Sequence, residues 1–272
     1  MLELRADLQS VFSTNDAFDR LMALDGAVYR ELGGRRTLRF EIDGRGYFLK
    51  AHYGVGWREI FKNLLQLRWP VLGAQNEKCA IERLGELGVE TMTIAGFGTR
   101  GKNPARRESF LITDELRETV SLEDFCRNWP DHPPAYPLRK ALLEKVADIA
   151  RTLHRNGVNH RDFYLCHFLM ELPLPLEVRD PARLRTYLID LHRVQLRSRT
   201  PRRWVVKDVA GLFFSSLDIG LSRRDVLRFV RRYSGKTLPV TLREDRAFWQ
   251  QVRQRAVRLY EKDFGRTPKL PI

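Results

Sequence analysis

The sequence predicts an α+β fold of two lobes, in which an N-terminal antiparallel sheet precedes a mainly helical C-terminal part. Three observations support this prediction. Segments of strand-forming residues bounded by turn signals dominate the first part of the chain. Asp43-Gly44, between two such segments, is a strong hairpin signal. From Ser121 onward the apolar residues recur with helical spacing instead.

The N-terminal part is predicted to hold a five-stranded antiparallel sheet. The strands are expected over residues 27–32, 36–42, 47–51, 91–97 and 109–113. Ser13-Thr14-Asn15 offers an N-cap for a short first helix. Two further helices are expected after the third strand, over about residues 57–67 and 74–87. Pro70 ends the first of them, and Gly88 suits the C-terminal cap of the second.

The C-terminal part is predicted to be mostly helical. Residues 130–137 form a loop with four prolines. Residues 138–156 form a long amphipathic helix, and Gly157 caps it. Short strands are expected between Asp162 and Asp190, and helices follow them.

The length and composition suit one large domain. Of the 272 residues, 43% are hydrophobic, which is enough for two lobes with sizeable cores. The pattern changes near Glu115, so we expect an N-lobe over residues 1–116 and a C-lobe over residues 117–272, which together make one domain.

The composition also excludes several classes of protein. A charged fraction of 30% with 10% aromatic residues argues against disorder. No apolar run approaches the ~20 residues that a membrane-spanning helix needs. The first residues include Glu3 and Asp7 and lack an apolar core, so we expect no signal peptide. The three cysteines are an odd number without metal-like spacing, which indicates reduced thiols and a cytoplasmic protein.

The net charge of +14 needs an explanation. Most of the basic residues are arginines, which suit bidentate contacts with phosphate and carboxylate groups. The candidate partners are nucleic acid, anionic lipid, a phosphorylated substrate or an acidic protein, and a merely solvated surface is the alternative. Because no nucleic-acid reader motif is recognisable, we expect no nucleic acid partner.

The segment His160–Leu169 carries the strongest functional signal. It reads HRDFYLCHFL, which matches the H-R-D-x-x-x-x-N catalytic loop of kinases except that His167 replaces the Asn. The Asp of that loop accepts or orients the proton of the attacking hydroxyl, so Asp162 is the predicted catalytic residue. The alternative for Asp162 is a structural pairing with Arg161.

Two residues are candidate metal ligands. Asp190 ends an apolar strand, as the Asp of the D-F-G motif does, and that carboxylate binds Mg²⁺. The triplet here is Asp190-Leu191-His192. His167 stands at the position that faces the metal and the phosphates. It can bind the metal through a neutral nitrogen, contact phosphate only, or be a packed core histidine.

Lys50 and Glu77 are the candidates for holding the donor phosphates. Lys50 ends the third predicted strand, where the kinase lysine grips the α- and β-phosphates and pairs with a helix Glu. Glu77 is the best-placed partner and Glu82 is the second choice. Taken alone, Lys50 would be a solvated lysine at a strand end.

Gly33 and Gly34 stand between the first two strands, where a Gly-rich phosphate loop belongs. Two glycines let backbone N–H groups approach a phosphate, and Arg35 or Arg36 can neutralise it. The G-x-G-x-x-G pattern is absent, however, and an ordinary turn is an equal alternative.

With these residues identified, the chain resembles the lipopolysaccharide core heptose(I) kinase family, which has a bilobal, protein-kinase-like fold. The resemblance extends from the strand that ends in Lys50 to the segment after Asp190. Its most specific parts are residues 159–168, 188–195 and 207–216. His167 in place of Asn also matches the pattern of this family.

The resemblance implies a sugar kinase that transfers phosphate from ATP, with Mg²⁺, to a heptose hydroxyl of the lipopolysaccharide core–lipid A acceptor. This acceptor carries phosphates and carboxylates at the cytoplasmic face of the inner membrane, so the resemblance also gives the positive charge a use in peripheral membrane contact. Backbone groups of Glu115 and Leu116 would contact the adenine.

Two other functions remain open from the sequence. A protein kinase, including one that phosphorylates its own tyrosines, would use the same residues. A catalytically inactive kinase-fold scaffold is favoured by His167 but disfavoured by the intact set of Lys50, Glu77, Asp162 and Asp190. No A-P-E segment follows Asp190, so we do not expect a regulated activation loop.

Overall fold

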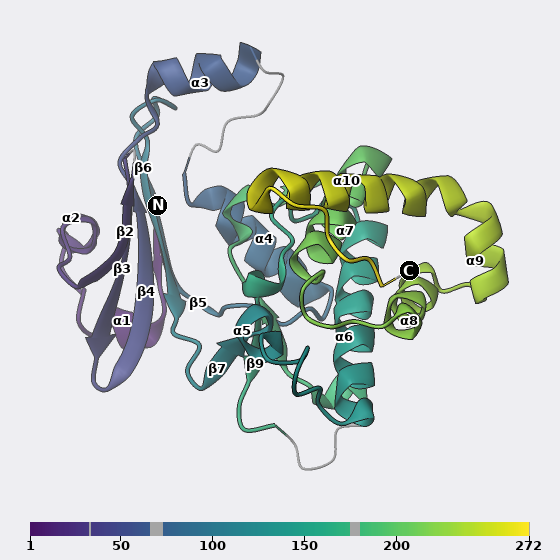
Figure 1. Cartoon of the computed structure of the whole chain (residues 1–272). Helices are drawn as coiled ribbons and strands as arrows, with labels where there is room; N and C mark the ends of the chain where they lie inside the picture. Colours follow the sequence, from purple (N-terminus) through teal and green to yellow (C-terminus); the bar gives the residue numbers. More distant parts are fainter. Residues whose placement is uncertain (33, 66–72, 175–179, 272) are drawn as a thin grey trace. The chain divides into compact units, whose positions relative to one another are not determined.

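The computed structural model describes residues 1–32, 34–65, 73–174 and 180–271. The chain divides into two compact units, and Figure 1 labels most of their elements. Unit 1 consists of Met1–Arg83, Met92–Leu116 and Leu191–Arg193. Unit 2 consists of Leu84–Thr91, Arg117–Asp190 and Val194–Ile272.

Unit 1 is built on a six-stranded sheet whose neighbouring strands are all antiparallel, in the order β1-β5-β6-β4-β3-β2. The strands are β1 (Leu2–Leu4), β2 (Ala27–Leu32), β3 (Arg35–Ile42), β4 (Arg45–His52), β5 (Ile94–Arg100) and β6 (Glu108–Asp114). The five predicted strands are present. The sixth strand, β1, was not predicted, because three residues are too few to show a period of two.

Two short helices, α1 (Ala6–Gln9) and α2 (Ala17–Met22), pack against this sheet. Leu8 of α1 and Leu21 of α2 lie in one buried cluster with strand residues such as Leu38. The expected N-cap at Ser13-Thr14-Asn15 was one residue too early, since α2 is preceded by Asp16, which makes no side-chain capping bond.

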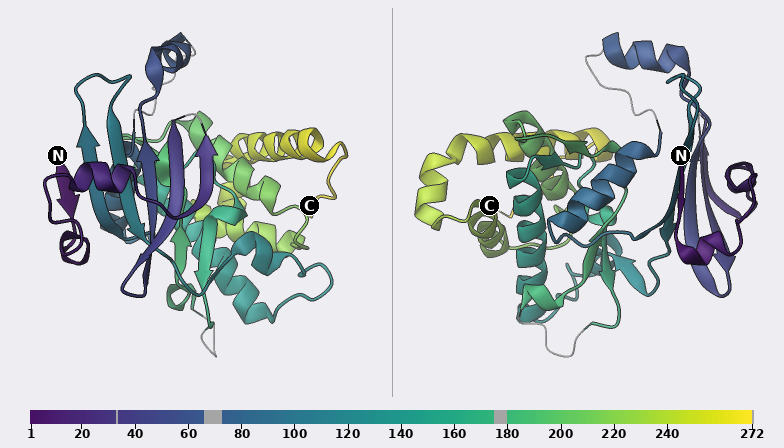
Figure 2. Two further views of the ribbon diagram at one scale, coloured as in Figure 1. Left: turned by 90° about the vertical axis from the view of Figure 1, so that its left-hand side faces the viewer. Right: turned by 180° about the vertical axis from the view of Figure 1, so that it is seen from behind.

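Two more helices follow β4, namely α3 (Gly56–Leu65) and α4 (Gln75–Glu86). Figures 1 and 2 draw α3 beyond the end of the sheet, and its Trp57, Phe61 and Leu65 side chains are exposed. On α4, the Asn76 side-chain amide donates to the His192 carbonyl at 2.8 Å, which ties the segment Leu191–Arg193 to unit 1.

Unit 2 is mainly helical. Its helices are α5 (Leu122–Cys126), α6 (Tyr136–Arg155), α7 (Arg202–Ser215), α8 (Arg223–Ser234), α9 (Leu238–Glu244) and α10 (Arg246–Phe264). Its short strands are β7 (Thr119–Ser121), β8 (Val158–Asn159), β9 (Phe168–Glu171), β10 (Thr186–Leu188) and β11 (Gln195–Leu196). In Figures 1 and 2, α10 crosses the direction of the long α6. Within the described residues, no helix has both the length and the apolar character needed to cross a bilayer.

The end of α6 shows how local chemistry positions the segment that follows. The helix begins at Tyr136 and not at the predicted Leu138, because Pro137 is tolerated in the first turn, where its missing N–H costs nothing. It ends at Arg155 with Asn156 as its C-cap, and the chain then turns at Gly157, whose φ is +77°. A Cβ atom on Gly157 would lie 1.7 Å from the Arg197 carbonyl oxygen. Only glycine therefore allows β8 to leave the helix and pair closely with β11.

Candidate active site

Unit 1 brings together the two residues predicted to hold the donor phosphates. Lys50 Nζ on β4 donates a hydrogen bond to Glu77 Oε1 on α4 at 2.6 Å. Glu77 is only 1% exposed, so its charge requires this cation nearby. Glu82, the second choice, pairs with Lys78 at 2.7 Å instead. The Lys50 side chain keeps 25% of its surface exposed, which leaves room for an anion to contact the ammonium group.

The glycine turn between β2 and β3 is described only in part, because Gly33 lies outside the described residues. Gly34 has a φ of +78°, and a Cβ atom there would lie 2.9 Å from the Gly54 carbonyl oxygen. The Gly34 carbonyl accepts the Tyr53 N–H at 2.8 Å. Backbone conformation and close approach are thus sufficient reasons for a glycine at position 34, and contact with phosphate stays a prediction.

Glu115 has a clear structural role in unit 1. The Arg39 guanidinium donates to both of its carboxylate oxygens, at 2.6 and 2.8 Å. The Glu115 N–H donates to the Gly46 carbonyl at 3.0 Å. A contact with adenine at Glu115 and Leu116 therefore stays a prediction, and it would have to use the other backbone groups of this segment.

In unit 2, a buried carboxylate fixes the predicted catalytic loop. Asp208 on α7 is 1% exposed. Its Oδ2 accepts the His160 N–H at 2.6 Å, and its Oδ1 accepts the Arg161 N–H at 2.9 Å. Arg161 has a left-handed φ of +78°, a conformation that costs a residue other than glycine about 1–3 kcal/mol. The two charge-assisted bonds offset this strain and set the backbone direction just before Asp162.

The His160 ring ties the loop to the strand that leads to Asp190. Its Nε2 lies 3.0 Å from the Ile189 carbonyl oxygen. Burial lowers the pKa of His160, so the ring is neutral and its single N–H must be the donor to that carbonyl. Asp190, the next residue, also has a left-handed φ, of +60°. The bond therefore fixes the point at which the chain turns to present the Asp190 carboxylate.

The structure brings Asp162, His167 and Asp190 into one cluster. His167 Nδ1 lies 2.7 Å from the Asp162 carbonyl oxygen, and because that oxygen can only accept, Nδ1 carries the proton. His167 Nε2 lies 3.5 Å from Asp190 Oδ2. In a neutral ring this nitrogen points a lone pair toward the carboxylate. The arrangement suits either a cation beside both atoms or a protonated ring.

This cluster fits a metal ion held jointly by protein and nucleotide. Among the described residues, no group of three or more His, Cys, Asp or Glu side chains is arranged to hold a metal ion. Mg²⁺ at phosphate-transfer sites needs only one or two carboxylates, because water and phosphate oxygens complete its shell. Asp190, with 32% of its side chain exposed, would supply one such carboxylate, and His167 Nε2 lies 3.5 Å from it.

Two residues of α7 are further functional candidates, which the sequence indicated only as part of the family-like segment 207–216 and without a role. Lys207 Nζ lies 4.0 Å from Asp162 Oδ1, and Asp208 holds the loop as described above. Their signal in the sequence was a charged pair inside an otherwise apolar helical segment, since burying a charge requires a partner. The sequence alone does not say which partner that is.

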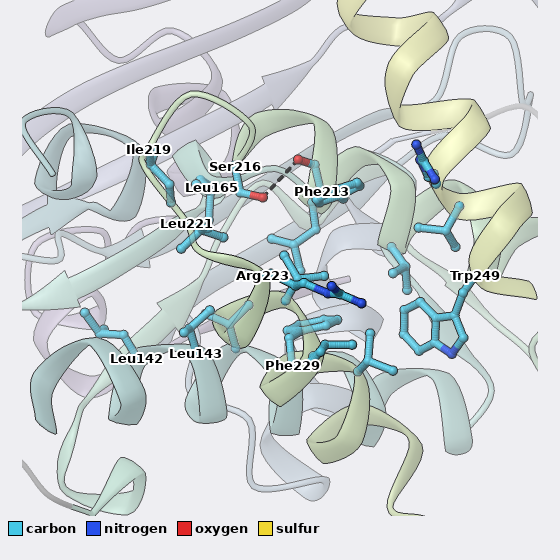
Figure 3. A pocket seen from close by; sticks show the side chains of 18 of the residues that line it. Leu142, Leu143, Leu165, Phe213, Ser216, Ile219, Leu221, Arg223, Phe229 and Trp249 are labelled. Atoms are coloured by element: carbon cyan, nitrogen blue, oxygen red, sulfur yellow. Dashed lines mark hydrogen bonds between the residues drawn. The ribbon is translucent and has the colours of Figure 1, made fainter. Parts of the chain in front are cut away.

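Unit 2 also contains an apolar cavity of about 670 Å³ that the sequence analysis did not predict. Side chains from α6, α7, α8 and α10 line it, among them Leu143, Phe229 and Trp249 in Figure 3. Three exposed arginines belong to the lining, namely Arg223, Arg246 and Arg253. The described lining includes no acidic residue. The cavity therefore suits a ligand whose apolar portion is adjacent to a negatively charged group.

Comparisons with known proteins place the chain among lipopolysaccharide kinases. It is 50% identical over 261 residues to the lipopolysaccharide core heptose(I) kinase WaaP of Pseudomonas aeruginosa, with 96% of each chain covered. It is 46% identical over 262 residues to the enzyme of the same name from Escherichia coli K12, covering 96% of this chain and 98% of the relative.

A solved structure described as WaaP in complex with acyl carrier protein superimposes with a TM-score of 0.83 at 46% identity. The match covers 96% of this chain and 100% of the solved one. The profile of the lipopolysaccharide kinase (Kdo/WaaP) family matches residues 19–233. The resemblance and the kinase-like α+β fold expected from the sequence are confirmed, and the chain belongs to the lipopolysaccharide kinase (Kdo/WaaP) family.

Proposed function

We propose that this chain transfers the γ-phosphoryl group of ATP to a heptose hydroxyl of the lipopolysaccharide inner core. The observation that carries the proposal is the cluster of Asp162, His167 and Asp190, in which Asp208 fixes the loop that carries Asp162 and His167. The identity of 45–50% to curated heptose(I) kinases over nearly the whole chain supports the choice of acceptor.

In this proposal Asp162 accepts or orients the proton of the heptose hydroxyl. The hydroxyl oxygen then attacks the γ-phosphorus, the bond from that phosphorus to the bridging oxygen breaks, and ADP leaves. Lys207, at 4.0 Å from Asp162 Oδ1, keeps the carboxylate next to positive charge. We assign Mg²⁺ to Asp190 with His167, where it would neutralise charge on the donor phosphates.

We assign the donor nucleotide to residues of unit 1. Lys50, held by Glu77, would bind the α- and β-phosphates. The turn at Gly33 and Gly34 and the backbone of Glu115 and Leu116 are further proposals, for phosphate and adenine respectively. The division into a nucleotide lobe, residues 1–116, and an acceptor lobe, residues 117–272, belongs to the same proposal.

The test is a transfer assay with ATP, Mg²⁺ and purified lipopolysaccharide whose core lacks phosphate. Mass spectrometry of the product and of the enzyme separates three outcomes. Phosphate on the heptose supports the proposal. Phosphate on tyrosines of the enzyme, with none on the acceptor, would point to a protein kinase. No transfer in the presence of bound ATP would point to a scaffold.

We also propose that the chain binds an acidic acyl carrier protein. The solved relative was described in complex with acyl carrier protein, a class of protein named for the acyl chain that it carries. The apolar cavity of about 670 Å³ gives that chain a place, and the exposed arginines in its lining match an acidic partner. Capture experiments with acyl-loaded and unloaded carrier test the idea. Arg246→Glu should weaken capture, and Arg255→Glu, outside the cavity, should not.

A peripheral location at the cytoplasmic face of the inner membrane is the last part of the proposal. On α3, the exposed Trp57, Phe61 and Leu65 recur every four residues, and the exposed Arg58 and Lys62 lie beside them. Exposed apolar groups next to cations are typical of helices that lie on anionic bilayers.

Vesicle flotation tests this membrane contact. Phosphatidylglycerol vesicles should carry the protein upward, whereas phosphatidylcholine vesicles should not. Phe61→Glu should abolish flotation, and Val28→Glu, at an apolar position on β2 of similar exposure, should not. Flotation that is unaffected by Phe61→Glu would contradict the assignment to α3.

A further inference from the structure

Three cations surround one indole ring in unit 2. Measured to the centroid of the Trp204 ring on α7, Arg161 Cζ lies at 5.3 Å, Arg203 Cζ at 5.5 Å and Lys207 Nζ at 5.8 Å. All three distances fall within the range of about 6 Å over which a ring face attracts a cation. The ring holds the cations in place, but they repel one another, so an anion would stabilise the group, which we call the Trp204 cluster.

The surroundings of the cluster add to its positive charge. Among the described residues, no ion pair joins Arg203 or the neighbouring Arg197 to a carboxylate. Arg197 donates instead to two neutral amide oxygens, Asn159 Oδ1 at 2.7 Å and Gln195 Oε1 at 2.9 Å. Burial and the charge of Arg203 lower the pKa of Arg197. Within the part of the chain that the structure describes, the charges of Arg197 and Arg203 are thus not balanced by an ion pair with a carboxylate.

The position of the cluster suggests what it binds. Lys207 connects it to the proposed catalytic residue, because its ammonium lies 4.0 Å from Asp162 Oδ1. Arg161 directly precedes Asp162 in the loop. A substrate whose hydroxyl reaches Asp162 would therefore bring its neighbouring groups close to these cations.

We infer that the Trp204 cluster is a subsite for an oxyanion carried by the acceptor, a carboxylate or phosphate on the sugar portion close to the hydroxyl that receives phosphate. The inference rests on the proposed function and adds the feature of the acceptor that is recognised. Arg203 binds the oxyanion, and the ring of Trp204 orients the Arg203 guanidinium. Lys207 links this subsite to Asp162. Arginine suits the role because its planar group can bind an oxyanion through two parallel hydrogen bonds.

Kinetics with both substrates test the subsite. Arg203→Ala should raise the KM for the acceptor about tenfold or more, as expected for a lost charge-assisted hydrogen bond, and leave the KM for ATP within about twofold. Arg203→Lys should recover part of the loss, and Trp204→Leu should produce a smaller loss in the same direction. Arg255→Ala, an exposed arginine on α10, removes the same charge and should change neither constant. A rise in the KM for ATP alone would assign the cluster to the donor and overturn the inference.

Chemically altered acceptors identify the oxyanion. The three acceptors are lipopolysaccharide lacking core phosphate, the same material after reduction of its carboxylates to alcohols, and the same material after removal of the lipid A phosphates. The penalty of Arg203→Ala should vanish on whichever acceptor has lost the group that Arg203 binds. A penalty that persists in full on both altered acceptors would overturn the inference.

A binding measurement separates this inference from the proposed function. Calorimetry without ATP, using the intact lipopolysaccharide that lacks core phosphate, reports binding even if no phosphate is transferred. The parent protein should bind it about tenfold or more tightly than Arg203→Ala does. Equal binding by both proteins would refute the subsite, whereas absence of transfer by the parent would refute only the reaction.

Discussion

Replacing the Asp208 carboxylate by an amide should destabilise the fold and slow the reaction together. In the parent, two carboxylate oxygens accept the N–H groups of His160 and Arg161 at 2.6 and 2.9 Å. The amide of Asp208→Asn has only one acceptor oxygen, so one of the two backbone N–H groups loses its charge-assisted bond. That buried N–H group then faces the NH₂ group of the amide. A bond to a charged group is worth about 1.5–3 kcal/mol, and an unsatisfied buried donor adds to the loss.

We therefore expect a loss of about 3 kcal/mol in the free energy of unfolding. For a chain of this length this corresponds to a fall of about 6–12 °C in Tm. The Arg161 backbone, no longer held at a φ of +78°, should relax and displace Asp162. Displacements of about 1 Å cost on the order of 10²-fold in rate.

Thermal unfolding followed by circular dichroism, together with kcat, measures both effects. The control is Asp263→Asn, an exposed aspartate on α10, which should match the parent. An Asp208→Asn protein with the Tm and kcat of the parent would refute the account. A lower Tm with an unchanged kcat would show that Asp208 supports the fold without positioning the loop.

The remaining predictions concern the donor site, the metal and pH. Lys50→Met should weaken Mg²⁺–ATP binding in calorimetry and cost about 3–5 kcal/mol of stability, because the buried Glu77 loses its cation. Adding Glu77→Leu should restore the stability but not the binding, and full ATP binding by Lys50→Met would contradict the donor assignment. His167→Asn should retain activity with an altered preference between Mg²⁺ and Mn²⁺, and His167→Ala should be slower; rates equal to the parent with each metal would leave His167 a packing role. Burial and nearby cations lower the pKa of His52 from 6.5 to about 4, so the folded protein excludes a proton that the unfolded chain takes up. The contribution of His52 to the free energy of unfolding should therefore fall by about 3 kcal/mol as the pH drops from 6.5 to 4. A Tm that does not change over this window would contradict the lowered pKa of His52.

Local patterns predicted most of the sheet and several site residues, because their signals lie within short stretches of sequence. Alternation and the Asp43-Gly44 turn gave β3 and β4, which place Lys50. The helical spacing after it gave α4, which places Glu77. The strand β1 was not predicted, because three residues are too few to show the alternation of a strand.

Contacts between distant segments could not be predicted in the same way. The bonds from Asp208 to His160 and Arg161 span 47 or 48 residues, and no local pattern records them. The Trp204 cluster depends likewise on the way α7 packs beside the loop. The cavity escaped for another reason, since an apolar helix face looks the same in sequence whether it borders a filled core or an empty space.

Single-turnover transfer from labelled ATP to lipopolysaccharide lacking core phosphate, compared between the parent and Asp162→Asn, tests the central claim most directly. The amide cannot take the proton of the hydroxyl, but it preserves the size of the side chain. The account predicts that label enters the heptose with the parent, and that Asp162→Asn transfers it at least about 10²-fold more slowly while binding Mg²⁺–ATP normally. Transfer at the parental rate by Asp162→Asn would contradict the assignment of Asp162 as the catalytic residue.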